Sequence, residues 1–240
     1  MSDPMPGRVL SFGAHPDDIE IGCGGTEAGL IKRGYRVSHV FATSGEAGSD
    51  RIAKSELAAI REDEARAAAG VLEVRDVEFL GMPDGLTQFT PEMKIAVIGM
   101  IRKVRPEIVF VHAACDRLLD HRVVHDLVIG AVTGAAGPWY QEAGGEPWQV
   151  PSVLGYEVWH PLSTYQLAVD ISAEIETKMA ALACHRSQME VIPYDQAFRG
   201  LARYRGIMSI SGDYAEVFEV IRAGSMIGDA IPGDTIETAE

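Results

Sequence analysis

Short apolar runs alternate with segments of helical periodicity along most of the chain. Four runs rich in β-branched residues predict strands at Arg8–Gly13, Val37–Thr43, Asp76–Leu80 and Pro106–His112. A segment with a helical pattern follows each run, and these segments are Thr26–Gly34, Ile52–Gly70, Pro91–Val104 and Asp120–Gly134. This alternation predicts an α/β fold, with a Rossmann-like, doubly wound, mostly parallel sheet and helices on both faces.

The second half of the chain continues the alternation less regularly. Val153–Trp159 and Gln166–Ile171 predict two further strands, and helices are expected near Glu174–Met189 and Ala197–Met208. Gly134–Val150 is rich in glycine and proline, and because strands resume after it, a surface loop is favoured over a domain linker. We therefore expect a single domain over residues 1–240.

The charge balance is strongly acidic and limits the classes of partner. Lys and Arg number 21 against 35 Asp and Glu, which gives a net charge of −14. This charge argues against general attraction to nucleic acid or to an anionic membrane. Three widely spaced cysteines are typical of reduced intracellular thiols. No run approaches the ~18 apolar residues of a membrane span, and no signal peptide is evident, so we predict a soluble, cytoplasmic protein.

The stretch AHPDDIEIGCGGT, Ala14–Thr26, directly follows the first predicted strand. His15, Asp17, Asp18 and Glu20 stand within six residues of one another. Like charges this close repel one another unless a cation binds them or one of them carries a proton. Open α/β sheets bind their ligands at the carboxyl ends of strands, so this cluster is a candidate site.

The glycines of the same stretch allow a different interpretation. A phosphate-binding turn would need a third glycine in the GxGxxG pattern begun by Gly22 and Gly24, but Glu27 stands there. The neighbouring acids would also repel a pyrophosphate. The glycines are also explained by a tight turn of the backbone and by close packing of the next helix on the strand.

A metal site accounts for the acids and the histidine together. His15 and Asp18 are three residues apart, across a turn that Pro16 begins, and both are ligand types for zinc. The segment Asp116–His125, which follows the fourth strand, offers further ligands. In the winding order 3-2-1-4, strands one and four are neighbours, so both segments would face one crevice.

These residues resemble the signature of the zinc-dependent LmbE-like (PIG-L) de-N-acetylases, which remove acetyl groups from N-acetylglucosaminyl compounds. The opening motif, His15-Pro16-Asp17-Asp18 followed by Gly22-x-Gly24-Gly25-Thr26, carries the resemblance. Weaker motifs follow in the family's order over most of the chain: Thr43-Ser44-Gly45-Glu46, Arg61-Glu62-x-Glu64, Gly81-x-Pro83-Asp84-Gly85, Asp120-His121-Arg122 and His185-x-Ser187-Gln188.

The resemblance implies a hydrolase that removes the acetyl group of an acetamido sugar by attack of a zinc-bound water. Zn²⁺ is the implied cofactor, although Fe²⁺ or another divalent metal suits the same ligands. A homo-oligomer is compatible with the resemblance. The implied site residues are His15, Asp18 and His121 as metal ligands, Asp17 as general base, Asp120 as the group that orients a histidine or the metal site, and Arg61 and Asp84 at the sugar.

Leu118 departs from the family pattern, which often has a histidine three residues before the metal histidine. A leucine can neither stabilise an oxyanion nor protonate a leaving amine. His112, His125 or His185 could assist instead, or Asp17 could return the proton.

Other interpretations remain open at this point. Arg61 lies in a helix full of Glu and Arg, where a surface ion pair is the usual role, and Asp84-Gly85 is a simple turn signal. Trp139, Tyr140 and Trp148 could line a pocket or a subunit contact. The chain as a whole could be another metal-dependent amidase or esterase on the same scaffold, or a non-catalytic nucleotide-binding module.

Overall fold

The computed structural model describes residues 7–224, which form one seven-stranded sheet with helices on both faces. The strands are β1 (Arg8–Gly13), β2 (Arg36–Phe41), β3 (Asp76–Phe79), β4 (Ile108–His112), β5 (Ser152–Tyr156), β6 (Leu167–Asp170) and β7 (Ala215–Arg222). The helices are α1 (Asp18–Lys32), α2 (Lys54–Val71), α3 (Pro91–Val104), α4 (Leu119–Ala135), η1 (Gln141–Ala143), α5 (Ile175–Leu182), α6 (Arg186–Met189) and α7 (Tyr194–Ser209).

The strand order is β3-β2-β1-β4-β5-β7-β6, and only β7 runs against its neighbours. Strands β1 to β5 are parallel, with β1 paired to both β2 and β4. The predicted doubly wound α/β fold is therefore confirmed, and β1 and β4 are neighbours as the winding order requires. Their carboxyl ends open at the same edge of the sheet.

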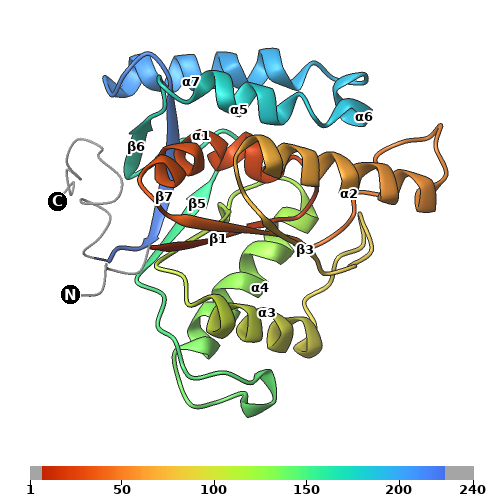
Figure 1. The fold of residues 1–240 in the computed structure, drawn as a ribbon, viewed down its shortest axis with the longest axis vertical. Helices are drawn as coiled ribbons and strands as arrows, with labels where there is room; N and C mark the ends of the chain where they lie inside the picture. Colours follow the sequence, from red (N-terminus) through yellow and green to blue (C-terminus); the bar gives the residue numbers. More distant parts are fainter. Residues whose placement is uncertain (1–6, 225–240) are drawn as a thin grey trace.

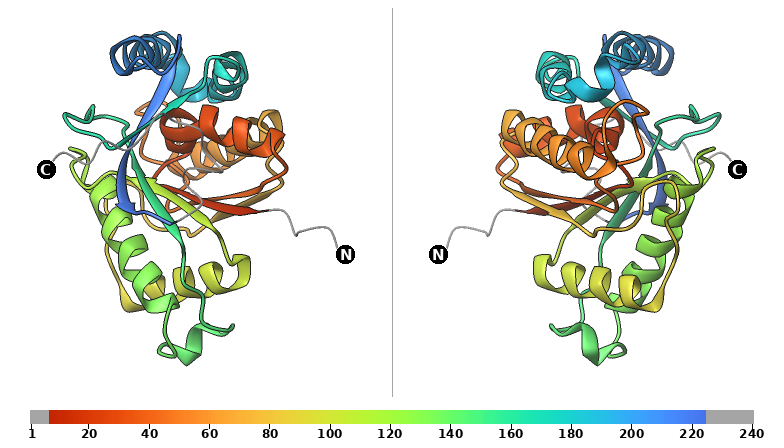
Figure 2. Two further views of the ribbon diagram at one scale, coloured as in Figure 1. Left: turned by 90° about the vertical axis from the view of Figure 1, so that its left-hand side faces the viewer. Right: turned by 90° about the vertical axis from the view of Figure 1, so that its right-hand side faces the viewer.

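The helices form layers on the two sides of the sheet (Figure 1). Helices α1 and α2 cover one face, and α3 and α4 pack together on the other. Helices α5 and α7 form a further layer outside α1 and α2, which the side views in Figure 2 also show. Helix α1 is thus enclosed between the sheet and α5, which explains why nearly all of its residues are buried.

The beginning of α1 corrects the predicted position of the glycines. We predicted a helix from Thr26, but α1 begins at Asp18, so Gly22, Gly24 and Gly25 lie inside the helix and make no turn. Gly22 packs against the ring of Tyr156 and Gly25 against Ile171. The glycines thus allow close packing of the helix, as one of our two explanations predicted. They form neither a tight turn nor a phosphate-binding turn.

Two features of the second half differ from the sequence prediction. Strand β7 was not predicted, and one inward residue of it, Glu216, is a buried carboxylate that interrupts the apolar pattern. Lys178 donates to this carboxylate at 2.6 Å, and the backbone N–H groups of Gly25 and Thr26 donate to it as well. The helix expected near Glu174–Met189 is split into α5 and α6.

The glycine- and proline-rich segment after α4 is held by Arg102, a buried residue of α3. Its guanidinium donates to backbone carbonyl groups, including those of Tyr140, Gly137 and Trp139. Among the described helices, none combines the length and apolar character that a membrane crossing requires.

We predict that Gly22→Ala and Gly24→Ala have opposite effects on stability. A Cβ atom at Gly22 would overlap the buried Tyr156 ring, whereas at Gly24 the nearest atom would be Glu20 Cβ at 3.8 Å. Overpacking should lower the free energy of unfolding of Gly22→Ala by about 1–3 kcal/mol. Gly24→Ala should gain about 0.5–1 kcal/mol from helix propensity. Urea unfolding of both variants tests this, and equal effects would contradict the packing described.

Candidate active site

The candidate site lies where β1 and β4 end. The turn after β1 contributes His15, and the first turn of α1 contributes Asp18. Asp18 Oδ2 accepts a hydrogen bond from the His15 backbone N–H at 2.7 Å, which closes this turn. His121 comes from the first turn of α4, which follows β4. Adjacent parallel strands thus bring together two segments that lie about a hundred residues apart.

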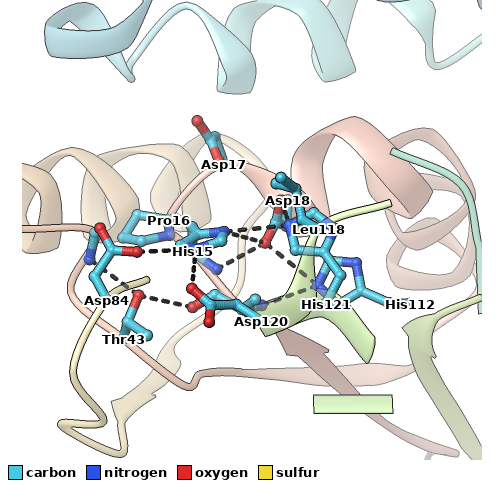
Figure 3. A network of polar contacts seen from close by, with 12 residues as sticks. His15, Pro16, Asp17, Asp18, Thr43, Asp84, His112, Leu118, Asp120 and His121 are labelled. Atoms are coloured by element: carbon cyan, nitrogen blue, oxygen red, sulfur yellow. Dashed lines mark hydrogen bonds and ion pairs between the residues drawn. The ribbon is translucent and has the colours of Figure 1, made fainter. Parts of the chain in front are cut away.

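Three possible metal ligands converge at this point (Figure 3). His15 Nδ1 and His121 Nε2 are 3.2 Å apart, and each lies 3.4 Å from an oxygen of Asp18. Asp18 and His121 are buried, and only His15 is partly accessible. Two imidazole nitrogens and a carboxylate oxygen, with one side open to a pocket, form a donor set that fits a catalytic zinc-type ion.

Each histidine of this group has a carboxylate behind it. The Nε2 atom of His15 lies 3.2 Å from Asp120 Oδ2, and Asp120 also accepts from the Gly85 backbone N–H and the Thr87 hydroxyl. The Nδ1 atom of His121 lies 3.3 Å from Asp116 Oδ2. Carboxylates in these positions fix the orientation of metal-binding imidazoles.

A second group of possible ligands, His15, Asp84 and Asp120, shares the His15 ring. His15 Nε2 lies 3.0 Å from Asp84 Oδ1 and 3.2 Å from Asp120 Oδ2. A neutral imidazole has one acceptor nitrogen and one N–H donor, so His15 cannot serve both groups as a ligand. If Nδ1 binds an ion, Nε2–H donates to these carboxylates, and the geometry favours a single ion.

His112 contacts this group but does not line the pocket. Its Nε2 accepts from the Ala14 backbone N–H at 2.9 Å, and its ring stacks on His121 with centroids 3.9 Å apart. Complete burial and the neighbouring His121 lower the pKa of His112 to about 4. His112 is therefore neutral and unsuited to donate a proton to a substrate.

Asp17 lies apart from the network of contacts drawn in Figure 3. Its backbone φ of 112° is in the left-handed region, which is rare for a residue with a side chain and often marks a functional site. Arg61 Nη2 donates to Asp17 Oδ2 at 3.2 Å and also to the Pro16 carbonyl oxygen. Burial raises the pKa of Asp17 to about 6, although the Arg61 guanidinium acts in the opposite direction.

A pocket of about 380 Å³ opens above these residues, a size that suits a small-molecule ligand. One part of its lining is polar, and another part consists of leucine and aromatic side chains. The lining residues are His15, Asp17, Asp18, Ala47, Gly48, Arg61, Asp84, Gly85, Leu118, Leu119, Asp120, Trp159, Gln188 and Tyr194.

The structure brings all the predicted site residues together. Six of them line the pocket, and His121 Nε2 lies 3.2 Å from His15 Nδ1. Arg61 is buried at the pocket and makes no surface ion pair. Asp84 Oδ2 accepts from the Ala47 backbone N–H, so this turn residue also ties two loops together.

The three histidines that we considered as replacements at Leu118 do not line the pocket. His125 Nδ1 bonds to the His112 carbonyl oxygen, and His185 is buried 3.4 Å from Glu20. The tryptophans of the glycine-rich segment are not in the pocket lining either; Trp148 Nε1 donates to the Pro106 carbonyl oxygen, two residues before β4.

Sequence reasoning missed the roles of three residues. Asp116 supports His121, while Trp159 and Tyr194 form part of the pocket wall. Asp116 lies in the same acidic-histidine segment as His121, five residues before it, and this position is the sequence signal for its role. The two aromatic residues carry no sequence signal, because only the packing of the loop after β5 and of α7 brings them to the site.

Known proteins resemble this chain in sequence. A family model described as PIG-L, GlcNAc-PI de-N-acetylase, matches residues 10–132, just over half of the chain. A diacetylchitobiose deacetylase of Thermococcus kodakarensis is 31% identical over 214 residues, which cover 84% of this chain and 79% of that protein. The chain belongs to the PIG-L family. The matched residues of the PIG-L model include His15, Asp18 and His121.

Solved structures agree on the fold. The N,N′-diacetylchitobiose deacetylase of Pyrococcus horikoshii superimposes on this PIG-L chain with a TM-score of 0.80 and 27% identity, covering 94% of this chain and 86% of that one. GalB, the 4-carboxy-2-hydroxymuconate hydratase of Pseudomonas putida KT2440, gives a TM-score of 0.81 at 24% identity, covering 90% and 96%. The second likeness is one of fold alone.

We predict that Asp17 titrates near pH 6 in the metal-free protein. Arg61→Met should raise this midpoint, because it removes the positive charge that favours the Asp17 carboxylate. Carboxyl ¹³C NMR of chelator-treated protein measures the titration. Arg66→Met is the control, because Arg66 pairs with Glu62 on the exposed face of the same helix. A midpoint near the usual 3.8, or no response to Arg61→Met, would contradict the environment described.

Proposed function

We propose that the protein is a metal-dependent de-N-acetylase that hydrolyses the acetamide of an N-acetylglucosaminyl-type sugar. The observation that carries this proposal is the convergence of His15, Asp18 and His121 beside Asp17, in a pocket of a PIG-L chain. The relatives named as deacetylases of acetylated amino sugars support the substrate class.

His15, Asp18 and His121 would hold the metal ion, and their donor types suit Zn²⁺ best and Fe²⁺ as well. When bound, such an ion lowers the pKa of a coordinated water to about 7 and polarises a carbonyl group. Asp120 and Asp116 would keep the two imidazoles in the tautomers that present Nδ1 of His15 and Nε2 of His121 to the ion.

Asp17 would act as the general base that accepts the proton of the attacking water. It lies in the pocket next to a proposed ligand, yet it is outside the ligand group itself. The hydrogen bond from Arg61 fixes its carboxylate, and its raised pKa brings it closer to the operating pH, which favours proton transfer in both directions. Asp17 can therefore also return the proton to the leaving amine, a step for which Leu118 offers no group.

Arg61 and Asp84 border the space beside Asp17 and would contact the hydroxyl groups of the sugar. Gln188 and Tyr194 add side-chain donors on the pocket surface. Burial raises the pKa of Tyr194 to about 12, so its phenol remains protonated and can donate a hydrogen bond to a developing oxyanion.

An alternative activity, hydrolysis of an acetyl ester on the same scaffold, is favoured by one observation. Leu118 stands on the His121 side of the site, and an alkoxide leaving group depends less on an acid than an amine does. The first experiment therefore includes both kinds of acetyl group.

We predict metal-dependent release of acetate from acetamido sugars. N-acetylglucosamine, N,N′-diacetylchitobiose, an N-acetylglucosaminyl inositol and an O-acetyl sugar would be assayed with the purified protein, with its metal content measured on the same sample. Chelation should abolish release, and added zinc should restore it.

Release from the O-acetyl sugar alone would replace the proposal by the esterase alternative. A protein that binds no metal, and releases no acetate after addition of zinc, would overturn both.

We further predict that substitutions of Asp17 and His121 impair different properties, turnover in the first case and metal binding in the second. Asp17→Asn should retain stoichiometric metal but lose about 10²–10⁴-fold in kcat, the usual contribution of a general base. His121→Ala should lose the metal itself, because it removes one of three ligands.

His125→Ala is the matched control, since His125 lies one helical turn further on and bonds only to the His112 carbonyl oxygen among the contacts described. Normal turnover in metal-loaded Asp17→Asn would exclude Asp17 as the base. Full metal content in His121→Ala would exclude His121 as a ligand.

A further inference from the structure

The pocket has an apolar wall, which we define as Leu118, Leu119 and Trp159. Leu118 lies beside Asp18 and His121, whereas Asp84 lies on the other side of His15 (Figure 3). Leu119, the next residue, is 55% exposed and leaves apolar surface at the pocket that a ligand can cover.

One buried carboxylate holds the apolar wall together. Asp116 Oδ1 accepts from the Leu118 backbone N–H at 2.9 Å, and Asp116 Oδ2 accepts from the Trp159 backbone N–H at 3.1 Å. The same carboxylate faces His121 Nδ1. The wall is thus fixed in position relative to the proposed metal ligand.

The Trp159 ring is also held from two sides. The Tyr194 ring meets it edge to face with centroids 5.5 Å apart, and the Arg117 guanidinium lies 5.4 Å from its centroid. These contacts make the aromatic part of the wall rigid before a ligand arrives. A rigid apolar surface reduces the ordering cost of binding an apolar group.

We propose that the apolar wall is a subsite for an apolar substituent, so that the preferred substrate is an acetamido sugar that carries an aryl or alkyl aglycone. This inference rests on the proposed deacetylase function. With the acetamide at the His15–Asp18–His121 group and the sugar hydroxyls at Arg61 and Asp84, the large apolar side chains that remain in the pocket lining are Leu118, Leu119 and Trp159. A polar aglycone would lose hydration there without gaining hydrogen bonds from the leucines.

The test compares the phenyl, hexyl and methyl glycosides of N-acetylglucosamine, in which the scissile amide is the same. We expect kcat/KM to be about tenfold higher for the phenyl and hexyl glycosides than for the methyl glycoside, which is in the range of one or two methylene groups in an apolar pocket. Leu119→Asn should reduce this ratio about threefold or more, because it replaces apolar surface of the wall by a polar group.

Leu86→Asn is the matched control, because Leu86 is a leucine of similar exposure, 68%, that does not line the pocket. Its phenyl-to-methyl ratio should equal that of the unaltered protein. Equal kcat/KM for the phenyl and methyl glycosides would overturn the subsite while leaving the deacetylase function in place.

A binding measurement separates the two proposals if turnover is absent. Calorimetric titration of the zinc-loaded Asp17→Asn protein with each glycoside should show tighter binding of the phenyl than of the methyl glycoside, again by about tenfold, and Leu119→Asn in that background should reduce the difference. Such a preference without acetate release from any acetamide in the unaltered protein would overturn the deacetylase function and retain the apolar subsite. No preference in binding would overturn the subsite.

Discussion

The close approach of His15, Asp18 and His121 is the constraint on which the rest of the site depends. Two imidazole nitrogens 3.2 Å apart would repel each other if both rings were protonated. The arrangement is therefore built for a shared cation or proton, and the surrounding groups serve that purpose. Asp120 and Asp116 contact the ring nitrogens of His15 and His121 that face away from the shared position. The neutral ring of His112 stacks on His121.

The same constraint explains the unusual environment of α1. This helix carries Asp18 at its first turn, so any movement of α1 would displace a proposed ligand from the group. On the sheet side, the buried Glu27 carboxylate accepts a hydrogen bond from the Ser11 hydroxyl and pairs with His39 Nε2 at 2.8 Å. On the outer side, the Lys178–Glu216 pair contacts the backbone of α1. Because Gly22 and Gly25 have no Cβ atom, Tyr156 and Ile171 can pack close to the backbone of the helix. Paired charges and close packing thus fix the position of α1 relative to the sheet.

The sequence was sufficient for the parts of the structure that depend on local pattern and on winding order. The parallel strands alternate with helices of clear periodicity, and the adjacency of β1 and β4 follows from that order. The part of α1 before Thr26 was missed because Gly22, Gly24 and Gly25 have poor helix propensity, which tertiary burial overrides. Strand β7 was missed because Glu216 occupies a buried position, which becomes acceptable through its pairing with Lys178 and its hydrogen bonds from the α1 backbone. Trp159 and Tyr194 could not be placed, since their position depends on packing between elements far apart in the chain.

The fold alone does not determine the reaction, because a deacetylase and a hydratase both superimpose on this chain. Which reaction such a fold catalyses depends on the side chains of the site, and in this chain Leu118 matters most. Leu118 offers no proton on that side of the site, and among the described lining residues Asp17 is the carboxyl group whose pKa is raised. The Arg61 guanidinium donates hydrogen bonds but does not release a proton. In the proposed mechanism, proton transfer would therefore fall to Asp17. Leu118 is also part of the apolar wall, so under both proposals this one residue would link the route of the proton to the kind of substituent that the pocket favours.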